Sequence, residues 1–80
     1  MTPAEIKELI ESHLDDCLAT VRSDDNTHFE AEVITREFSG KRALQRHQMV
    51  YAALGDRMGG EIHALSIQAL TPEEVAGGGG

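Results

Sequence analysis

The sequence has very little cysteine and few aromatic residues. Its single cysteine, Cys17, excludes an intramolecular disulfide and a multi-cysteine zinc site. Tryptophan is absent, and aromatic residues make up only 4% of the 80 positions. So few rings argue against a surface that binds nucleic acid by base stacking, and they favour a small aliphatic core.

Long apolar runs are also absent. No stretch approaches the roughly 20 residues needed to span a bilayer, and the N-terminus is too acidic and polar for a secretory signal. We therefore expect a cytoplasmic protein with no membrane association. A chain of this length has room for one core, so we expect a single domain at 1–76 and a flexible glycine tail at 77–80.

Basic residues are scarce, and most of them lie close together. The net charge of −7 disfavours non-specific attraction to nucleic acid. Five of the seven basic residues nevertheless fall between positions 36 and 57. The overall charge argues against nucleic-acid binding, whereas this local cluster leaves it open.

The hydrophobic pattern predicts an α-β-β-α-β order with a brief helix at the end. The expected helices lie at 3–14, at 41–54 and from 71 onward, and the expected strands at 18–22, 29–33 and 62–70. Thr2, Pro3 and Glu5 are typical of a capped helix start. A tight polar turn makes the first two strands antiparallel, and a right-handed helical crossover makes the last two parallel. We therefore predict an α+β fold, a three-stranded mixed sheet with helices on one face.

Alternation predicts which strand residues are buried. In the second strand Phe29, Ala31 and Val33 should face the core, and His28 should face water with the intervening glutamates. The second helix is harder to orient. Its predicted buried stripe is Ala43, Leu44, His47, Val50, Tyr51 and Leu54, and its predicted outer stripe is Arg42, Gln45, Arg46 and Met49.

Several motifs, in the right order along nearly the whole chain, resemble those of the BolA family. They are Thr27-His28-Phe29, the stretch from Phe38-Ser39-Gly40 to Arg46-His47 and Val50-Tyr51, Ile62-His63-Ala64-Leu65, and Thr71-Pro72-Glu73-Glu74. The short first loop looks most like the compact branch called IbaG. The resemblance implies a fold similar to class II KH domains and a partnership with monothiol glutaredoxins in iron–sulfur cluster trafficking and stress regulation. It also implies an alternative, because bacterial members have been described as DNA-binding transcriptional regulators of stress response and morphology.

His63 is the first candidate ligand for an iron–sulfur cluster, because imidazole is a good ligand for iron. From spacing alone it is more often a structural histidine at a strand start, and its alternation with Leu65 and Ile67 turns it partly toward the core. The resemblance implies that His63 holds a two-iron, two-sulfur (2Fe–2S) cluster shared with a glutaredoxin. The isolated chain is not expected to bind a cofactor.

His28 is the second candidate ligand. The resemblance implies a histidine or cysteine in the loop between the first two strands, but the loop at 23–27 contains neither, and Asp25 occupies about that place. His28 is the nearest soft donor and could substitute, and the other interpretation is a surface histidine at a strand end. Cys17 is predicted to be a small buried apolar residue rather than a ligand.

Gly40, Lys41, Arg42 and Arg46 are the candidate nucleic-acid-binding residues. Arg42 and Arg46 are four positions apart and so share a helical face, while Gly40 and the helix N-terminus allow close approach to a phosphate. The alternative is a solvated or salt-bridged basic face, since the Gly-x-x-Gly motif of KH domains is absent. The same patch could instead dock a glutaredoxin.

No catalytic constellation is recognisable, so we expect a binding module rather than an enzyme. The expected partner is a monothiol glutaredoxin in a heterodimer. DNA is the alternative partner, and a weak homodimer is a further option.

Overall fold

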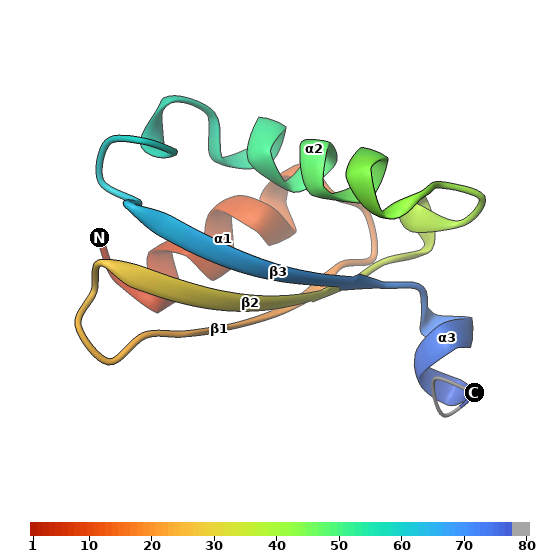
Figure 1. The fold of residues 1–80 in the computed structure, drawn as a ribbon. Coiled ribbons are helices and arrows are strands. Elements are labelled where there is room, and N and C mark those ends of the chain that lie inside the picture. Colours follow the sequence, from red (N-terminus) through yellow and green to blue (C-terminus); the bar gives the residue numbers. More distant parts are fainter. Residues whose placement is uncertain (78–80) are drawn as a thin grey trace.

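A computed structural model describes residues 1–77, in which the chain forms a sheet layer and a helix layer (Figure 1). The elements are α1 (Pro3–His13), β1 (Leu18–Arg22), β2 (His28–Ile34), α2 (Ala43–Leu54), β3 (Ala64–Leu70) and α3 (Pro72–Ala76), with short 3-10 helices η1 (Arg36–Phe38) and η2 (Gly55–Arg57). The predicted order is confirmed. Of the predicted glycine tail, Gly77 caps the end of α3, and positions 78–80 lie outside the described residues.

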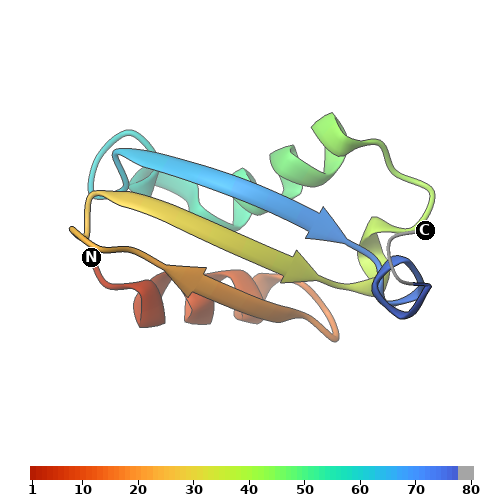
Figure 2. The same ribbon diagram turned by 60° about the horizontal axis from the view of Figure 1, so that its bottom comes forward.

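The sheet has the strand order β1-β2-β3. β1 pairs antiparallel with β2, and β2 pairs parallel with β3, as predicted. Both long helices lie on the same face of this sheet, while α3 sits beyond the end of β3 (Figure 2). The predicted α+β fold, with a mixed three-stranded sheet and helices on one face, is therefore confirmed.

Helix starts follow the predicted capping pattern at both ends of the chain. The Thr2 hydroxyl accepts the Glu5 backbone N–H at 3.3 Å, and the Glu5 carboxylate accepts the Thr2 N–H at 2.9 Å. Thr71 and Glu74 make the same reciprocal pair at the start of α3. Each reciprocal pair, known as a capping box, satisfies two N–H groups that the helix backbone leaves unpaired. The capping box thereby fixes the residue at which the helix begins.

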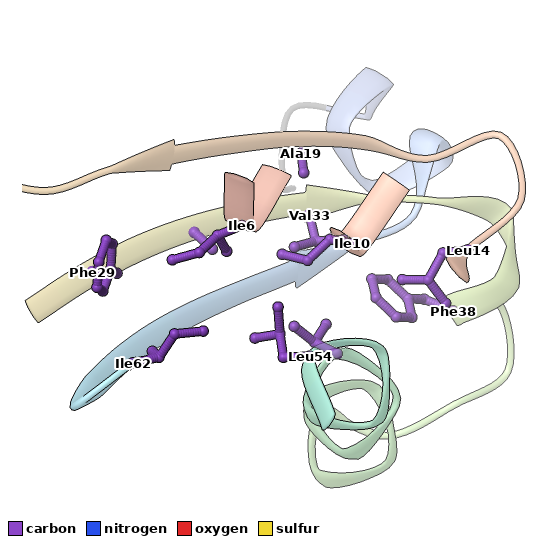
Figure 3. Close-up of a cluster of buried hydrophobic side chains, with 11 residues drawn as sticks. Ile6, Ile10, Leu14, Ala19, Phe29, Val33, Phe38, Leu54 and Ile62 are labelled. Atoms are coloured by element: carbon purple, nitrogen blue, oxygen red, sulfur yellow. The ribbon is translucent and has the colours of Figure 1, made fainter. Parts of the chain in front are cut away.

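The core lies between the sheet and the two long helices (Figure 3). Phe29, Ala31 and Val33 of β2 are buried, whereas the glutamates between them are exposed, as the alternation predicts. From α1, Ile6 and Ile10 are fully buried against them. This packing fixes the register of β2, because a slip by one residue would put its glutamates into the core.

The predicted face of α2 is only partly correct. Leu44 is 69% exposed and Tyr51 is 40% exposed, although both were expected in the buried stripe. Val50 and Leu54 are buried as predicted. Ala53 is buried with them, and Arg46 and Met49, expected on the outer stripe, turn inward beside them. The residues Met49 to Leu54 are almost all apolar, so the sequence marks no single buried face, and packing against the sheet decides the rotation.

The start of β3 also differs from prediction. The strand begins at Ala64 instead of residue 62, because Ile62 belongs to a closed loop in which its N–H donates to the Arg57 carbonyl at 2.9 Å. Ile62 and Leu65 both face the core. In a regular strand residues three positions apart face opposite sides, so the inward–outward alternation shifts by one residue between Ile62 and Leu65. As a result His63 is exposed rather than turned partly toward the core.

Candidate functional site

His28 and His63 lie side by side at one end of the sheet. His28 is the first residue of β2, and its strand partner is Ala64, the residue that follows His63. The two imidazole rings meet edge to face, with centroids 5.8 Å apart and planes at 88°. Both residues are exposed. The parallel pairing of β2 with β3 therefore joins the two predicted cluster ligands into one accessible pair.

The turn between β1 and β2 holds His28 in place. The Oδ1 atom of Asp25 accepts the backbone N–H groups of Thr27 and His28, each at 2.9 Å. Its Oδ2 atom lies 2.8 Å from Nδ1 of the His28 ring. The Ser23 hydroxyl donates to the His28 carbonyl at 2.6 Å. His28 is thus anchored through both backbone groups and through its ring.

Asp25 is a site residue that the sequence interpretation did not assign to any role. Hydrogen bonds from the His28 backbone, the His28 ring and the Thr27 backbone lower the pKa of its carboxyl well below the usual range. An aspartate three positions before a histidine, within a polar turn, was the available signal. Aspartate commonly accepts backbone N–H groups two or three residues ahead, and this places its second oxygen near the side chain that follows.

The donor chemistry of this pair suits one iron of a 2Fe–2S cluster. In Rieske centres two imidazoles bind the same iron, and thiolates bind the other. Two exposed rings on adjacent strands, with centroids 5.8 Å apart, place two such imidazoles next to each other. Two histidines thus match the donor type of one such iron.

Cys17 does not belong to this site. It precedes Leu18, whose strand partner is Ile34 at the far end of β2 from His28. The length of this strand separates them by about 20 Å. The thiol is half-buried against the core, and this burial, with Glu11 and Glu37 nearby, raises its pKa to about 11. Such a thiol is a poor metal ligand, because ligation requires the thiolate.

The four predicted nucleic-acid-binding residues lie at the opposite end of β3 from the histidines. Gly40 adopts a positive φ of 75°, and both Lys41 and Arg42 are exposed at the start of α2. Arg46 is different, because only 13% of its side chain is exposed. The prediction that Arg42 and Arg46 project together from one helical face is therefore wrong, and the salt-bridged alternative holds for Arg46.

Arg46 is bound within the fold. Its Nε atom donates to the Lys41 carbonyl at 2.9 Å and its Nη1 atom to the Ala69 carbonyl at 3.0 Å. The same guanidinium pairs with the Glu74 carboxylate at 2.7 Å and lies 5.8 Å from the ring centroid of Phe38. These contacts use the charge and donors that a phosphate would need.

His47, expected in the buried stripe, is half-buried. Across residues 1–77, each helix is too short or too polar to cross a bilayer.

Comparison with known proteins gives one family. The model of the BolA-like protein family matches residues 1–74. BolA-like protein 1 of Homo sapiens is 50% identical over 48 residues, which are 60% of this chain and 35% of the human protein. The matched segment thus spans little more than a third of that curated relative.

Solved structures agree with the sequence comparison. A bolA protein homologue from Coxiella burnetii superposes with a TM-score of 0.86 and 42% identity, covering 95% of this chain and 97% of that chain. The solution structure of yeast Fra2 has a TM-score of 0.71 and 30% identity, covering 95% of this chain and 85% of that chain. The element order and sheet topology described above are thus shared with both.

Proposed function

This chain belongs to the BolA-like family, and we propose that it is a non-enzymatic partner of a monothiol glutaredoxin in iron–sulfur cluster assembly and trafficking. His63 and His28 would hold one side of a shared 2Fe–2S cluster. The observation that carries the proposal is the contact of these two exposed rings across adjacent strands.

The chemistry of the pair supports a shared cluster over one held by this chain alone. A 2Fe–2S cluster takes four ligands, and two imidazoles are half of that number. A monothiol glutaredoxin would bring the thiolate of its single active-site cysteine, and a bound small thiol such as glutathione would bring the fourth ligand, so that sulfur complements the nitrogen ligands. When bound, such a cluster supplies electron-accepting iron whose potential is higher with histidine than with thiolate ligation. This chain's own residues would then bind and orient the cluster and set its potential.

The position of the pair also supports a docked partner. Both histidines lie at one end of the sheet, where His28 lines an open hollow together with the β1–β2 turn residues Ser23 to Asp25. A protein approaching this end of the sheet meets the rings before any core residue. The basic patch at the start of α2 lies about 20 Å away along β3. It is therefore not required for the cluster contact.

Visible circular dichroism of the mixed proteins tests the proposal. The purified chain is mixed under anaerobic conditions with a monothiol glutaredoxin that carries a 2Fe–2S cluster. We expect a new spectrum with the wild-type chain, because histidine replaces a ligand on one iron. We expect His63→Ala to abolish the change, and His28→Ala to reduce it.

The matched control is His13→Ala, which removes another exposed histidine, at the last residue of α1. It should give the wild-type spectrum. A wild-type spectrum from His63→Ala would show the ligand assignment to be wrong. Absence of any complex with the glutaredoxin, measured by calorimetry with and without cluster, would remove the proposed partner altogether.

A further inference from the structure

We infer that Asp25 is a positioning residue, which holds the His28 ring so that its Nε2 atom presents a free lone pair to an incoming metal. The inference rests on the proposed function for its purpose, but the arrangement itself belongs to the isolated chain. It is carried by the 2.8 Å contact between Asp25 Oδ2 and His28 Nδ1.

The chemistry of the two groups determines the tautomer. An ionised carboxylate can only accept hydrogen bonds, so the Nδ1 atom facing it must carry the ring proton. A neutral imidazole has one N–H, and Nε2 is then left as the basic nitrogen. Metal-binding histidines almost always donate their other N–H in this way, commonly to a carboxylate.

The turn gives Asp25 little freedom to move away. Its other oxygen, Oδ1, accepts the backbone N–H groups of Thr27 and His28, so one carboxylate binds both the backbone and the ring. Ser23 strengthens the turn further, because its hydroxyl accepts the Asn26 N–H at 2.9 Å. The His28 ring is therefore held by Asp25, and Asp25 is held by the hydrogen bonds of its own turn, as a preorganised ligand requires.

The same contact sets the direction of the ring. His28 meets His63 edge to face, so rotation of the His28 side chain would break the hydrogen bond to Asp25 and change the ring-to-ring geometry together. The short loop at 23–27 has no histidine or cysteine of its own. In this arrangement the loop contributes through Asp25, which orients a ligand without being one.

Asp25→Asn is the sharpest test, because asparagine keeps the turn and reverses the contact with the ring. Its carbonyl oxygen can still accept the two backbone N–H groups, while its NH2 group faces Nδ1 as a donor. We therefore expect the His28 ring to switch to the Nε2–H tautomer. Asp24→Asn, in the exposed neighbour within the same turn, is the matched control.

The readout is nitrogen-15 NMR of the isolated chain, which reports the tautomer of each histidine through long-range couplings. Spectra are recorded at about pH 8, above the ordinary histidine pKa of about 6.5, so that the rings are neutral. We expect Nδ1–H for His28 in the wild type and Asp24→Asn, and Nε2–H in Asp25→Asn. The same His28 tautomer in wild type and Asp25→Asn would overturn the inference, irrespective of how well either protein retains a cluster.

A second measurement separates this inference from the proposed function. In the cluster-bearing complex, we expect Asp25→Asn to lose cluster about tenfold faster than wild type and Asp24→Asn. A switched tautomer with wild-type cluster retention would overturn the claim that the orientation serves ligation. A switched tautomer together with no effect of His63→Ala would instead contradict the proposed function and leave the Asp25–His28 contact intact.

Discussion

The guanidinium of Arg46 donates to both carboxylate oxygens of Glu74, at 2.7 and 3.3 Å, and thereby ties α3 to α2. Glu74 also accepts the Thr71 N–H within its own capping box. The Glu74 carboxylate therefore caps the start of α3 and neutralises the Arg46 cation near the start of α2. This arrangement changes what the basic patch can do, and it gives the fold a pH-sensitive contact.

Removal of Arg46 should destabilise the fold. Arg46→Met keeps an inward-facing side chain of similar length but leaves the Lys41 and Ala69 carbonyls without their donor. We expect a loss of about 2 kcal/mol in the free energy of unfolding at neutral pH, measured by urea denaturation. Arg42→Met, at the exposed neighbouring position, should change it by less than about 0.5 kcal/mol. Equal effects of the two substitutions would contradict the inward position of Arg46.

The contribution of Glu74 should disappear in acid. The Arg46 hydrogen bond, followed by the Thr71 N–H, lowers the pKa of Glu74 from 4.5 to about 2. A lowered folded-state pKa means that the stabilisation is fully present above pH 4.5 and is lost as the pH falls toward 2. We expect the difference in melting temperature between wild type and Glu74→Gln to shrink over this range. A constant difference would refute the linkage.

The rotation of α2 predicts unequal effects of two apolar substitutions. Val50 is fully buried, whereas Leu44 is 69% exposed. We expect Val50→Ala to cost about 2 kcal/mol of unfolding free energy and Leu44→Ala less than about 0.5 kcal/mol, both from urea midpoints. Similar losses at both positions would support the helix face first predicted from the sequence, in which Val50 and Leu44 are both buried.

DNA binding through the basic patch should be weak and only slightly salt-dependent. Of its three charged residues, only Lys41 and Arg42 are free to reach phosphates, because Arg46 is paired with Glu74. Two phosphate contacts give a slope of log K against log salt of about −2. Lys41→Gln with Arg42→Gln should flatten the slope measured by fluorescence anisotropy. A flattening on replacement of Arg46 alone would contradict this account.

The strands and their pairing could be predicted because local patterns determine them. The alternation of Phe29, Ala31 and Val33 with glutamates, and the capping pair Thr2 and Glu5, each require only neighbouring residues to be recognised. The same holds for the polar turn before β2. The sequence motifs singled out His28 and His63 separately, and the pairing of β2 with β3 places the two side by side.

The remaining features depend on contacts between distant residues. The partner of Arg46 lies in α3, and the apolar run at Met49 to Leu54 allows several helix rotations, so the exposed side of α2 required the packed structure. The outward direction of His63 follows from the closed loop that ends at Ile62. The sequence shows that Asp25 lies three positions before His28 within the turn. The hydrogen bond between the Asp25 carboxylate and the His28 ring could be recognised only from the three-dimensional geometry.

Pulsed electron paramagnetic resonance can detect whether nitrogen atoms of His63 and His28 bind cluster iron, as we propose. This chain alone is labelled with nitrogen-15 histidine, joined to a cluster-bearing monothiol glutaredoxin, and reduced so that the 2Fe–2S cluster becomes paramagnetic. We expect strong nitrogen-15 couplings that diminish in His28→Ala and are lost when His63→Ala is added. A spectrum without nitrogen-15 coupling from this chain would contradict this ligand assignment.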